Sequence, residues 1–230
     1  MIETFKRTEK KFVLNEYQYK HLMKKINDHI LKDKYHKSKI CNIYFDTDNY
    51  DLIVKSIEKP LYKEKVRLRS YKVPGETDEV FLELKKKYKG IVSKRRIKIK
   101  LKDFYNYYNK GIIPECNRQI FNELDYTFKK YDLKPVMFIA YDRLSFYDKD
   151  DKNFRLTIDQ KLRFRQEELY LENGDSGKLY FDENMYLMEA KALNSYPLWF
   201  IKALSELKVY STTFSKYGNI YKSIGDGKYV

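Results

Sequence analysis

Residues 62–101 read YKEKVRLRSYKVPGETDEVFLELKKKYKGIVSKRRIKIKL, and this stretch decides the fold. Charged and apolar side chains alternate in three runs, at 62–71, 79–85 and 93–101. Successive side chains of a strand point to opposite faces, so each run predicts a strand with one charged and one apolar face. The turn Val73-Pro74-Gly75-Glu76 predicts that the first two strands form an antiparallel hairpin.

The rest of the chain predicts more strands, with helices near both ends and in the middle. Further strands are expected at Glu9–Leu14, Lys39–Phe45, Val136–Phe146, Phe154–Ile158, Lys161–Arg165 and Tyr186–Ala190. A first helix is expected after the N-cap Asn15, with an apolar stripe of Leu22, Met23, Ile26 and Ile30. Residues 103–131 are expected to form two helical pieces with a break near Gly111 and Pro114. A last helix is expected after Pro197, with an apolar stripe of Leu198, Ile201, Leu204 and Leu207. About eight strands with these helices indicate one α+β domain over residues 1–230.

Composition describes a basic globular protein. The 47 Lys and Arg residues exceed the 33 Asp and Glu residues and give a net charge of +14. This excess favours an anionic partner, although a general bias toward lysine would produce the same composition. Cys41 and Cys116 fit neither a disulfide framework nor a zinc site. Because no signal peptide or long apolar segment is evident, we expect a cytoplasmic location.

Two predicted strands carry rows of like charge. Lys63, Lys65, Arg67 and Arg69 share one face, and Lys94, Arg96, Lys98 and Lys100 share another. Such rows are common on the solvated side of a sheet. Because like charges in register repel each other, the rows also favour a polyanion that neutralises them.

Glu-x-Lys recurs on the predicted strands, at Glu9/Lys11, Glu83/Lys85 and Glu189/Lys191, and once on the last helix, at Glu206/Lys208. Each pair is explained equally by a simple ion pair. A chemical interpretation assigns the carboxylates to Mg²⁺ or Mn²⁺ and the cations to phosphate oxygens, which is most of what phosphoryl transfer requires. The sequence has no P-loop and no G-x-G-x-x-G motif.

An ordered series of short motifs extends this pattern along the chain. It comprises Arg7-x-Glu9-x-Lys11, Tyr44-Phe45-Asp46-Thr47, Lys65-Val66-Arg67-Leu68-Arg69, Phe81-Leu82-Glu83-Leu84-Lys85, Ser93-Lys94-Arg95-Arg96, Tyr141-Asp142-Arg143, Arg155-Leu156-Thr157-Ile158-Asp159, Leu187-Met188-Glu189-Ala190-Lys191 and Ser215-Lys216-Tyr217. From about Phe5 to Tyr217 the series resembles the VTC domain, the polyphosphate polymerase domain of the triphosphate tunnel metalloenzyme (CYTH-like) superfamily. The resemblance implies a closed antiparallel eight-stranded β-barrel flanked by helices, with the charged faces inside.

The resemblance also implies an activity and a set of site residues. The expected enzyme is a phosphotransferase that passes the γ-phosphate of ATP to a polyphosphate chain, with Mn²⁺ or Mg²⁺ as cofactor. Predicted phosphate clamps are Lys11, Arg67, Arg69, Lys85, Lys94, Arg143, Arg155 and Lys216, with further binding contacts from Ser215, Lys63, Lys65 and Lys191. Glu189 is the expected metal ligand, and Glu9, Glu83 and Asp159 are further candidates for the metal or for orienting lysines.

Several alternatives stay open on the sequence alone. A tripolyphosphatase or nucleoside triphosphatase would use the same residues, and a non-catalytic module that binds polyphosphate or inositol phosphates would need only the cations. Arg7 stands where the hydrolytic branch carries a carboxylate, which favours binding of a phosphate chain over two-metal hydrolysis. Nucleic acid is not the expected partner, since acids within the basic rows would repel its backbone. Any coupling to a membrane would come from a membrane-protein partner.

Overall fold

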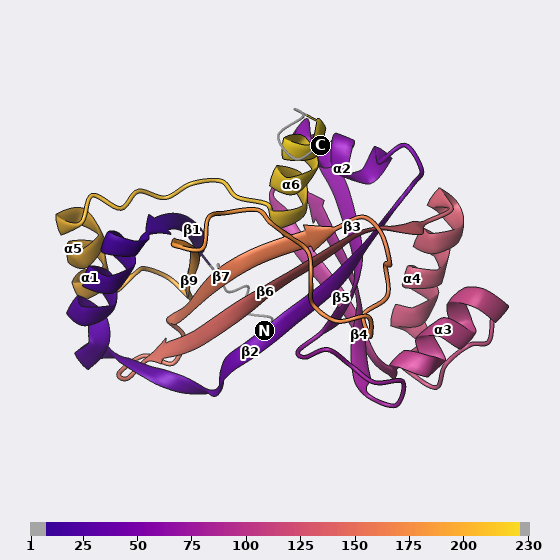
Figure 1. Ribbon diagram of the computed structural model, residues 1–230, viewed down its shortest axis with the longest axis horizontal. Coiled ribbons are helices and arrows are strands. Elements are labelled where there is room, and N and C mark those ends of the chain that lie inside the picture. The colour runs from indigo at the N-terminus through magenta and orange to yellow at the C-terminus, as the bar shows by residue number, and fades with distance from the viewer. Residues whose placement is uncertain (1–7, 226–230) are drawn as a thin grey trace, which may run out of the picture. The chain divides into compact units, whose positions relative to one another are not determined.

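The computed structural model describes residues 8–225 (Figure 1). Arg7, and Phe5 at the start of the resemblance, lie outside this range. The elements in chain order are β1 (Thr8–Asn15), α1 (Glu16–Ile26), the 3₁₀ turn η1 (Asn27–His29), β2 (Ile30–Asp46), α2 (Asp51–Ile57), β3 (Tyr62–Ser70), β4 (Glu79–Tyr88), β5 (Ile91–Lys100), α3 (Leu101–Lys110), α4 (Arg118–Tyr131), β6 (Lys134–Asp148), β7 (Arg155–Arg165), β8 (Lys178–Leu179), β9 (Met185–Ala192), α5 (Leu198–Glu206) and α6 (Lys216–Gly225). No helix within 8–225 is both long and apolar enough to cross a bilayer.

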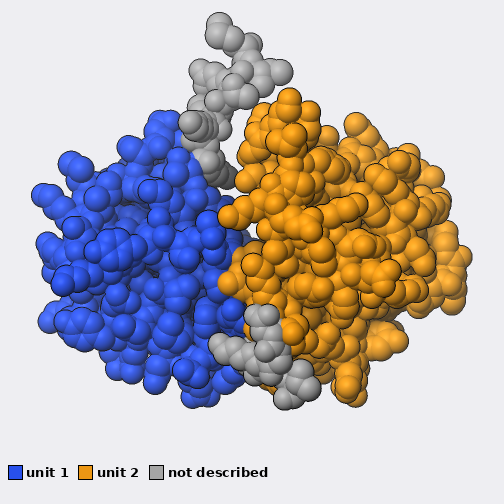
Figure 2. Space-filling model, turned by 90° about the horizontal axis from the view of Figure 1, so that it is seen from above, with its two compact units in different colours: residues 1–38, 141–162, 179–214 blue, residues 39–140, 163–178, 215–230 orange. Residues whose placement is uncertain are grey.

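The chain folds into two compact units, coloured separately in Figure 2. Unit 1 comprises residues 1–38, 141–162 and 179–214, and unit 2 comprises residues 39–140, 163–178 and 215–230. Each unit therefore draws on separate parts of the sequence, which explains why no linker is visible as a stretch of Gly, Pro or Ser.

The strands form one open sheet, so the predicted closed eight-stranded barrel is wrong. The sheet has nine strands in the order β1-β9-β7-β6-β2-β3-β4-β5, with β8 paired to β7. Closure would require the first and last strands to pair, and no such pairing occurs within the described residues. The outer edge of β1 is met instead by a later segment, because the Thr212 amide donates to the Lys11 carbonyl at 2.8 Å. At the other end, β5 is rich in Lys and Arg, as exposed edge strands often are.

In unit 2, β3, β4 and β5 form two consecutive hairpins. The predicted β3–β4 hairpin is confirmed, and its turn is closed by hydrogen bonds between Gly75 and Asp78. The next turn consists of Lys89 and Gly90, both with positive φ (45° and 87°), the backbone of a two-residue type I′ turn. The apolar face of these strands packs against α3 and α4, the two helices that lie beside β4 and β5 in Figure 1. The core between them includes Val66, Leu68, Leu82, Leu84, Ile97, Phe104, Phe121 and Leu124. Burial of each such side chain stabilises the fold by roughly 1.5–3 kcal/mol.

In unit 1, the apolar face of β1, β9 and β7 packs against α1 and α5. Asn15 caps α1 as predicted, accepting from the Gln18 amide, while the Gln18 side chain accepts from the Asn15 amide. Leu22 and Ile26 of the predicted stripe are buried and Met23 packs beside them, whereas Ile30 begins β2 rather than ending the helix. The core also contains Phe12, Leu14, Phe154, Leu156, Ile158, Met188 and Phe200.

The predicted apolar stripe of α5 is wrong in its first half, although Leu204 and Leu207 pack against the core as predicted. Leu198 is 74% exposed and Ile201 47%, whereas Phe200 and Ala203 are buried. Phe200 lies among the rings of Phe12 and Phe154, at 6.1 and 5.1 Å between centroids. Because an aromatic ring buries more apolar area than an isoleucine, the helix turns Phe200 to the core.

Other differences concern element boundaries. The two strands expected at Phe154–Ile158 and Lys161–Arg165 are one strand, β7, in which Lys161 has a φ of 52°. Helix α3 begins at Leu101, which the alternating pattern had placed in a strand, and the break at Gly111 is confirmed by its positive φ of 70°. Helices α2 and α6, which frame part of the site in unit 2, were not predicted from the sequence.

Candidate functional site

The charged face of β3, β4 and β5 lies on the side of the strands opposite α3 and α4. We define the charged face as Lys63, Lys65, Arg67, Arg69, Glu83, Lys85, Lys94 and Arg96. The register places Arg67 opposite Glu83 and Glu83 opposite Arg96, and it aligns Lys65, Lys85 and Lys94 in a second row. The charged rows predicted on two separate strands are therefore parts of a single surface. Seven of its eight members are cations, so it is suited to a polyanion.

Glu83 is the centre of the charged face. Its side chain is only 2% exposed, and Arg67 reaches Oε2 with Nε and Nη2, both at 2.7 Å. Lys94 Nζ and Arg96 Nε lie 2.7 and 3.2 Å from Oε1 as ion pairs, although neither Oε1 nor Arg96 Nε has an aligned hydrogen bond. Burial alone would raise the pKa of Glu83, but Arg67, Arg69 and Lys94 lower it to about 2. Glu83 is thus a permanent anion that gathers cations.

Arg96 is held by two aromatic residues as well as by Glu83. Arg96 stacks on the Phe81 ring at 3.6 Å from its centroid and donates to the Tyr71 hydroxyl at 2.9 Å. The side chains of Lys94 and Arg96 remain 44% and 33% exposed. They can therefore meet a ligand without first leaving Glu83.

The lysines at the edge of the charged face repel one another. Partial burial lowers the pKa of Lys63, and the charges of Lys87, Lys59 and Lys85 lower it further. Lys63 Nζ donates to the Ser56 carbonyl of α2 at 3.1 Å, an uncharged partner that leaves the excess charge in place. An anion bound here would relieve this repulsion.

Arg69 is a buried member of the charged face, and its position is set by residues to which the sequence analysis gave no role. Its Nε donates to Asn42 Oδ1 at 2.8 Å, and the Asn42 amide donates to the Ile139 carbonyl at 3.0 Å. Tyr44, two residues further along β2, accepts from Arg67 Nη1 at 3.2 Å. The i, i+2 spacing of Asn42 and Tyr44 is the signal that could have placed both beside the arginines.

Asp46 ties α2 and α6 to the end of β2. Its carboxylate accepts from the amides of Leu52 and Ile53 at the start of α2, at 2.8 and 3.0 Å. It also accepts from the buried Tyr217 hydroxyl at 2.9 Å, and the Tyr217 ring stacks on Tyr44. Burial, followed by the nearby Asp46 carboxylate, raises the pKa of Tyr217. The phenol therefore stays protonated and donates to Asp46.

Ser215 and Lys216 stand at the start of α6. Ser215 Oγ accepts from Lys65 Nζ at 2.9 Å and from the Gly218 amide at 3.2 Å, and its own proton is left to donate. A Cβ at Gly218 would meet Ser215 Oγ at 3.2 Å and Ile53 Cδ1 at 3.5 Å, so the glycine lets α6 approach α2 closely. The predicted contacts Ser215 and Lys65 are brought together here.

Unit 1 carries a second group of predicted residues, on the face of β1 and β9 opposite their helices. The register pairs Glu9 with Lys191 and Lys11 with Glu189, so acids and bases alternate along each strand and also across the two strands. Lys191 Nζ lies 2.6 Å from Glu189 and 3.5 Å from Glu9. Lys11 lies 3.8 Å from Glu9 and donates to the Phe214 carbonyl at 2.8 Å. We call Glu9, Lys11, Glu189 and Lys191 the acid–base quartet.

The remaining predictions fall on β6 and β7 of unit 1. Arg143 binds Asp159 through two parallel contacts, Nε to Oδ1 at 2.6 Å and Nη2 to Oδ2 at 2.8 Å. Asp159 is buried, and the guanidinium of Arg143 contacts both of its carboxylate oxygens. Arg155 lies opposite Lys191 in the ladder and is exposed.

The fit of a divalent metal differs among the four predicted carboxylates. Glu83 and Asp159 are buried and bind arginines, whereas Glu9 and Glu189 are diagonal neighbours on one face of β1 and β9 and lie within ion-pair distance of Lys191. Within residues 8–225, no group of three or more His, Cys, Asp or Glu side chains is arranged to hold a metal. Glu9 and Glu189 fit an ion that takes its other oxygens from water or phosphates, as Mg²⁺ often does.

Comparison with known families identifies the fold carrying these residues. The model of the VTC domain matches residues 6–224, nearly the whole chain. The chain belongs to the VTC domain family. No curated protein matches it.

Among solved structures similar to this chain, one has a TM-score above 0.5 and so shows a shared fold. A candidate adenylate cyclase from Bacillus halodurans is 14% identical, with a TM-score of 0.55 over 90% of this chain and 92% of its own. A candidate adenylate cyclase from Vibrio parahaemolyticus is 7% identical (TM-score 0.48, 95% and 99% covered), and the Mimivirus capping enzyme triphosphatase is 10% identical (TM-score 0.37, 87% and 88% covered). The first of these shares its fold with the VTC domain described here.

Proposed function

We propose that this VTC domain is a polyphosphate polymerase, which transfers the γ-phosphoryl group of ATP to the end of a polyphosphate chain. The observation that carries the proposal is the charged face of unit 2, where seven cations share one face with the buried carboxylate of Glu83. A linear chain of phosphates matches such a surface because it carries negative charge at regular intervals. The series of motifs along the chain supports the same assignment.

The charged face would act by position and charge. Phosphoryl transfer spreads negative charge over the phosphate oxygens, and fixed cations stabilise that charge most when they need not reorganise. Arg67, Lys94 and Arg96 are already oriented by Glu83, so a phosphate chain would meet donors in place. Because Lys65 already holds Ser215 Oγ, the Ser215 hydroxyl would donate to a phosphate oxygen.

Glu189 and Glu9 are our candidates for holding Mn²⁺ or Mg²⁺ in unit 1. The ion would supply positive charge to phosphate oxygens. Lys191, now on Glu189, would turn to a phosphate when an ion takes its place, and Lys11 would remain as a second cation. Glu83 and Asp159 would orient arginines instead, since their oxygens already serve that purpose.

The test is incubation of the purified protein with ATP and Mn²⁺, followed by gel analysis of the product. We expect long-chain polyphosphate from the wild type and its loss in Glu189→Ala. The matched control is Glu206→Ala, which removes the acid of the Glu206/Lys208 pair at the end of α5. Release of free phosphate alone would reject the polymerase, and release from tripolyphosphate without chain growth would identify a hydrolase.

A further inference from the structure

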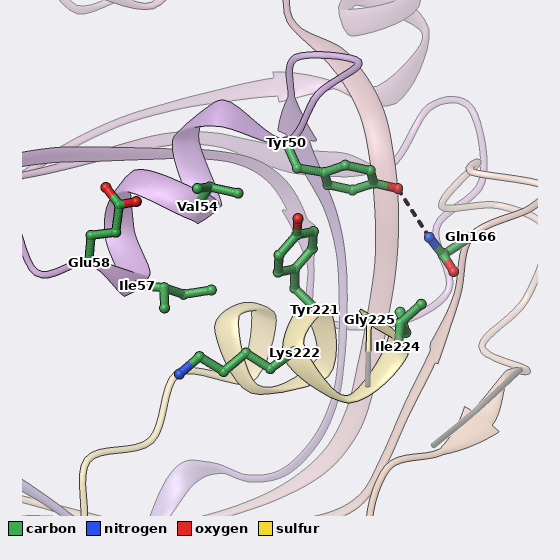
Figure 3. A pocket seen from close by; sticks show the side chains of 9 residues that line it. All are labelled: Tyr50, Val54, Ile57, Glu58, Gln166, Tyr221, Lys222, Ile224 and Gly225. Carbon is green, nitrogen blue, oxygen red and sulfur yellow. Dashed lines mark hydrogen bonds between the residues drawn. The ribbon is translucent and has the colours of Figure 1, made fainter. Parts of the chain in front are cut away.

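Unit 2 contains a cavity between α2 and α6 that none of the predicted site residues line (Figure 3). Its volume is about 530 Å³, within the usual range for small-molecule sites. Its walls combine two tyrosine rings, aliphatic side chains and one amide, from Tyr50, Val54, Ile57, Tyr221, Ile224 and Gln166. Figure 3 shows Glu58 and Lys222 at the end away from Gln166.

The polar groups of the cavity gather around Tyr50. The Gln166 amide nitrogen donates to the Tyr50 hydroxyl at 3.1 Å, drawn as the dashed line in Figure 3. That bond leaves the Tyr50 proton to donate and the Gln166 amide oxygen to accept. The Tyr221 ring lies 5.1 Å from the Tyr50 ring, centroid to centroid. One donor and one acceptor thus stand beside an aromatic surface.

The backbone of Tyr50, which carries that ring, is strained. Its φ and ψ are 59° and 33°, in the left-handed region that a bulky residue seldom adopts. Such strain concentrates where a side chain is held for a ligand. The Val54 amide donates to the Tyr50 carbonyl at 3.0 Å and helps to fix this conformation.

Both helices that frame the cavity also contact the charged face. Lys63 binds the Ser56 carbonyl of α2, and Lys65 binds Ser215 at the start of α6. From Lys216 to Tyr221, α6 rises by roughly 7–8 Å. A ligand with phosphates near Lys65 would therefore place its other end beside the second turn of α6.

We propose that this cavity binds the purine base of the nucleoside triphosphate donor. The inference rests on the proposed function, which supplies ATP as the substrate. The base would stack on Tyr221, and its ring nitrogen and exocyclic amine would meet the Tyr50 proton and the Gln166 oxygen. A purine is flat and apolar on its faces with polar edges, which matches a cavity with ring walls and one polar corner. The cavity would thereby distinguish ATP from a bare phosphate chain.

The test compares ATP with tripolyphosphate, which has the phosphates but no base, by calorimetric titration in Mg²⁺. Stacking of a base on an aromatic side chain is worth about 1–3 kcal/mol, or roughly 5- to 150-fold in affinity. We expect Tyr221→Ala to weaken ATP by a factor in that range and to leave tripolyphosphate unchanged. Tyr221→Phe keeps the ring and should bind ATP almost as the wild type does.

Two further variants guard against a simple folding defect. Gln166→Ala changes an exposed side chain and should also weaken ATP alone, whereas Tyr126→Ala removes an exposed tyrosine of α4 outside the cavity and should change neither ligand. Equal loss of both ligands in Tyr221→Ala and Gln166→Ala, or unchanged ATP affinity in both, would overturn the base site while the polymerase proposal stands. If the wild type binds neither ligand, both proposals fail.

Discussion

Arg67 binds Glu83 through two nitrogens, Nε and Nη2, each 2.7 Å from the same carboxylate oxygen. The two residues face each other across β3 and β4, and Arg96 faces Glu83 from β5. A carboxylate buried among cations stabilises the fold and also fixes the cations in place.

Glu83→Gln should destabilise the protein at neutral pH. The amide keeps the shape of the side chain but leaves three cations around a neutral group. Breaking a buried ion pair from one side costs about 3–5 kcal/mol. Denaturant unfolding at pH 7 measures this loss, and Glu79→Gln, which removes an exposed partner of Lys98, should cost less than about 1 kcal/mol. Equal stability of wild type and Glu83→Gln would contradict the role given to Glu83.

The stabilising effect of Glu83 should disappear in acid. Its pKa falls from the usual 4.5 to about 2 on folding, so the stability it contributes is fully present above pH 4.5 and lost as the pH falls toward 2. A shift of this size corresponds to roughly 3 kcal/mol. Unfolding free energies of the wild type and Glu83→Gln should therefore converge between pH 4.5 and 2. A constant difference across that window would place the pKa elsewhere.

Binding of a polyphosphate should take up protons at alkaline pH. Burial and neighbouring lysines hold the pKa of Lys63 below its usual 10.5, so part of this lysine is neutral at a pH just below that value. A bound polyanion favours the charged form and raises the pKa again. Calorimetry of tripolyphosphate binding in buffers of different ionisation enthalpy counts these protons. Lys63→Met should reduce the count, and an unchanged count would show that the protons bind elsewhere.

The aromatic core of unit 1 should depend on Phe200 and not on its exposed neighbours. Phe200→Ala should cost about 3–5 kcal/mol, because it leaves a cavity between Phe12 and Phe154. Leu198→Ser should change the unfolding free energy by less than about 0.5 kcal/mol, since Leu198 lies mostly in solvent. A large decrease in the unfolding free energy of Leu198→Ser would show that Leu198 is buried, as the sequence predicted.

Tyr217→Phe should loosen the connection between α6 and β2. The change removes the hydroxyl that donates to Asp46 but keeps the ring stacked on Tyr44. Loss of one buried hydrogen bond to a charged group costs about 1.5–3 kcal/mol, measurable by thermal unfolding. Tyr126→Phe, at an exposed position, should have no effect. A Tyr217→Phe protein as stable as the wild type would show that Asp46 holds α2 without this bond.

Alternation along the strands predicted the charged face well, because the period of two survives whatever the rest of the chain does. Lys65 and Arg67 share a face of β3 for that reason alone, and the register of β3 with β4 adds Glu83 to it. Whether the sheet closes was not predictable from the same signal, since pairing of the end strands depends on contacts such as Thr212 with Lys11. The predicted stripe of α5 was wrong at Leu198 and Ile201, because the stripe was drawn from residue spacing without considering that the larger ring of Phe200 would be buried. The cavity at Tyr50 lies on α2 and α6, and both helices lacked a sequence signal strong enough to predict them.

The most direct test of the account is a crystal structure with tripolyphosphate and Mn²⁺. We predict phosphate oxygens within hydrogen-bond distance of Arg67, Lys94 and Arg96, with Glu83 still bound to Arg67. A triphosphate bound away from the charged face, with these three side chains unchanged, would contradict the central claim.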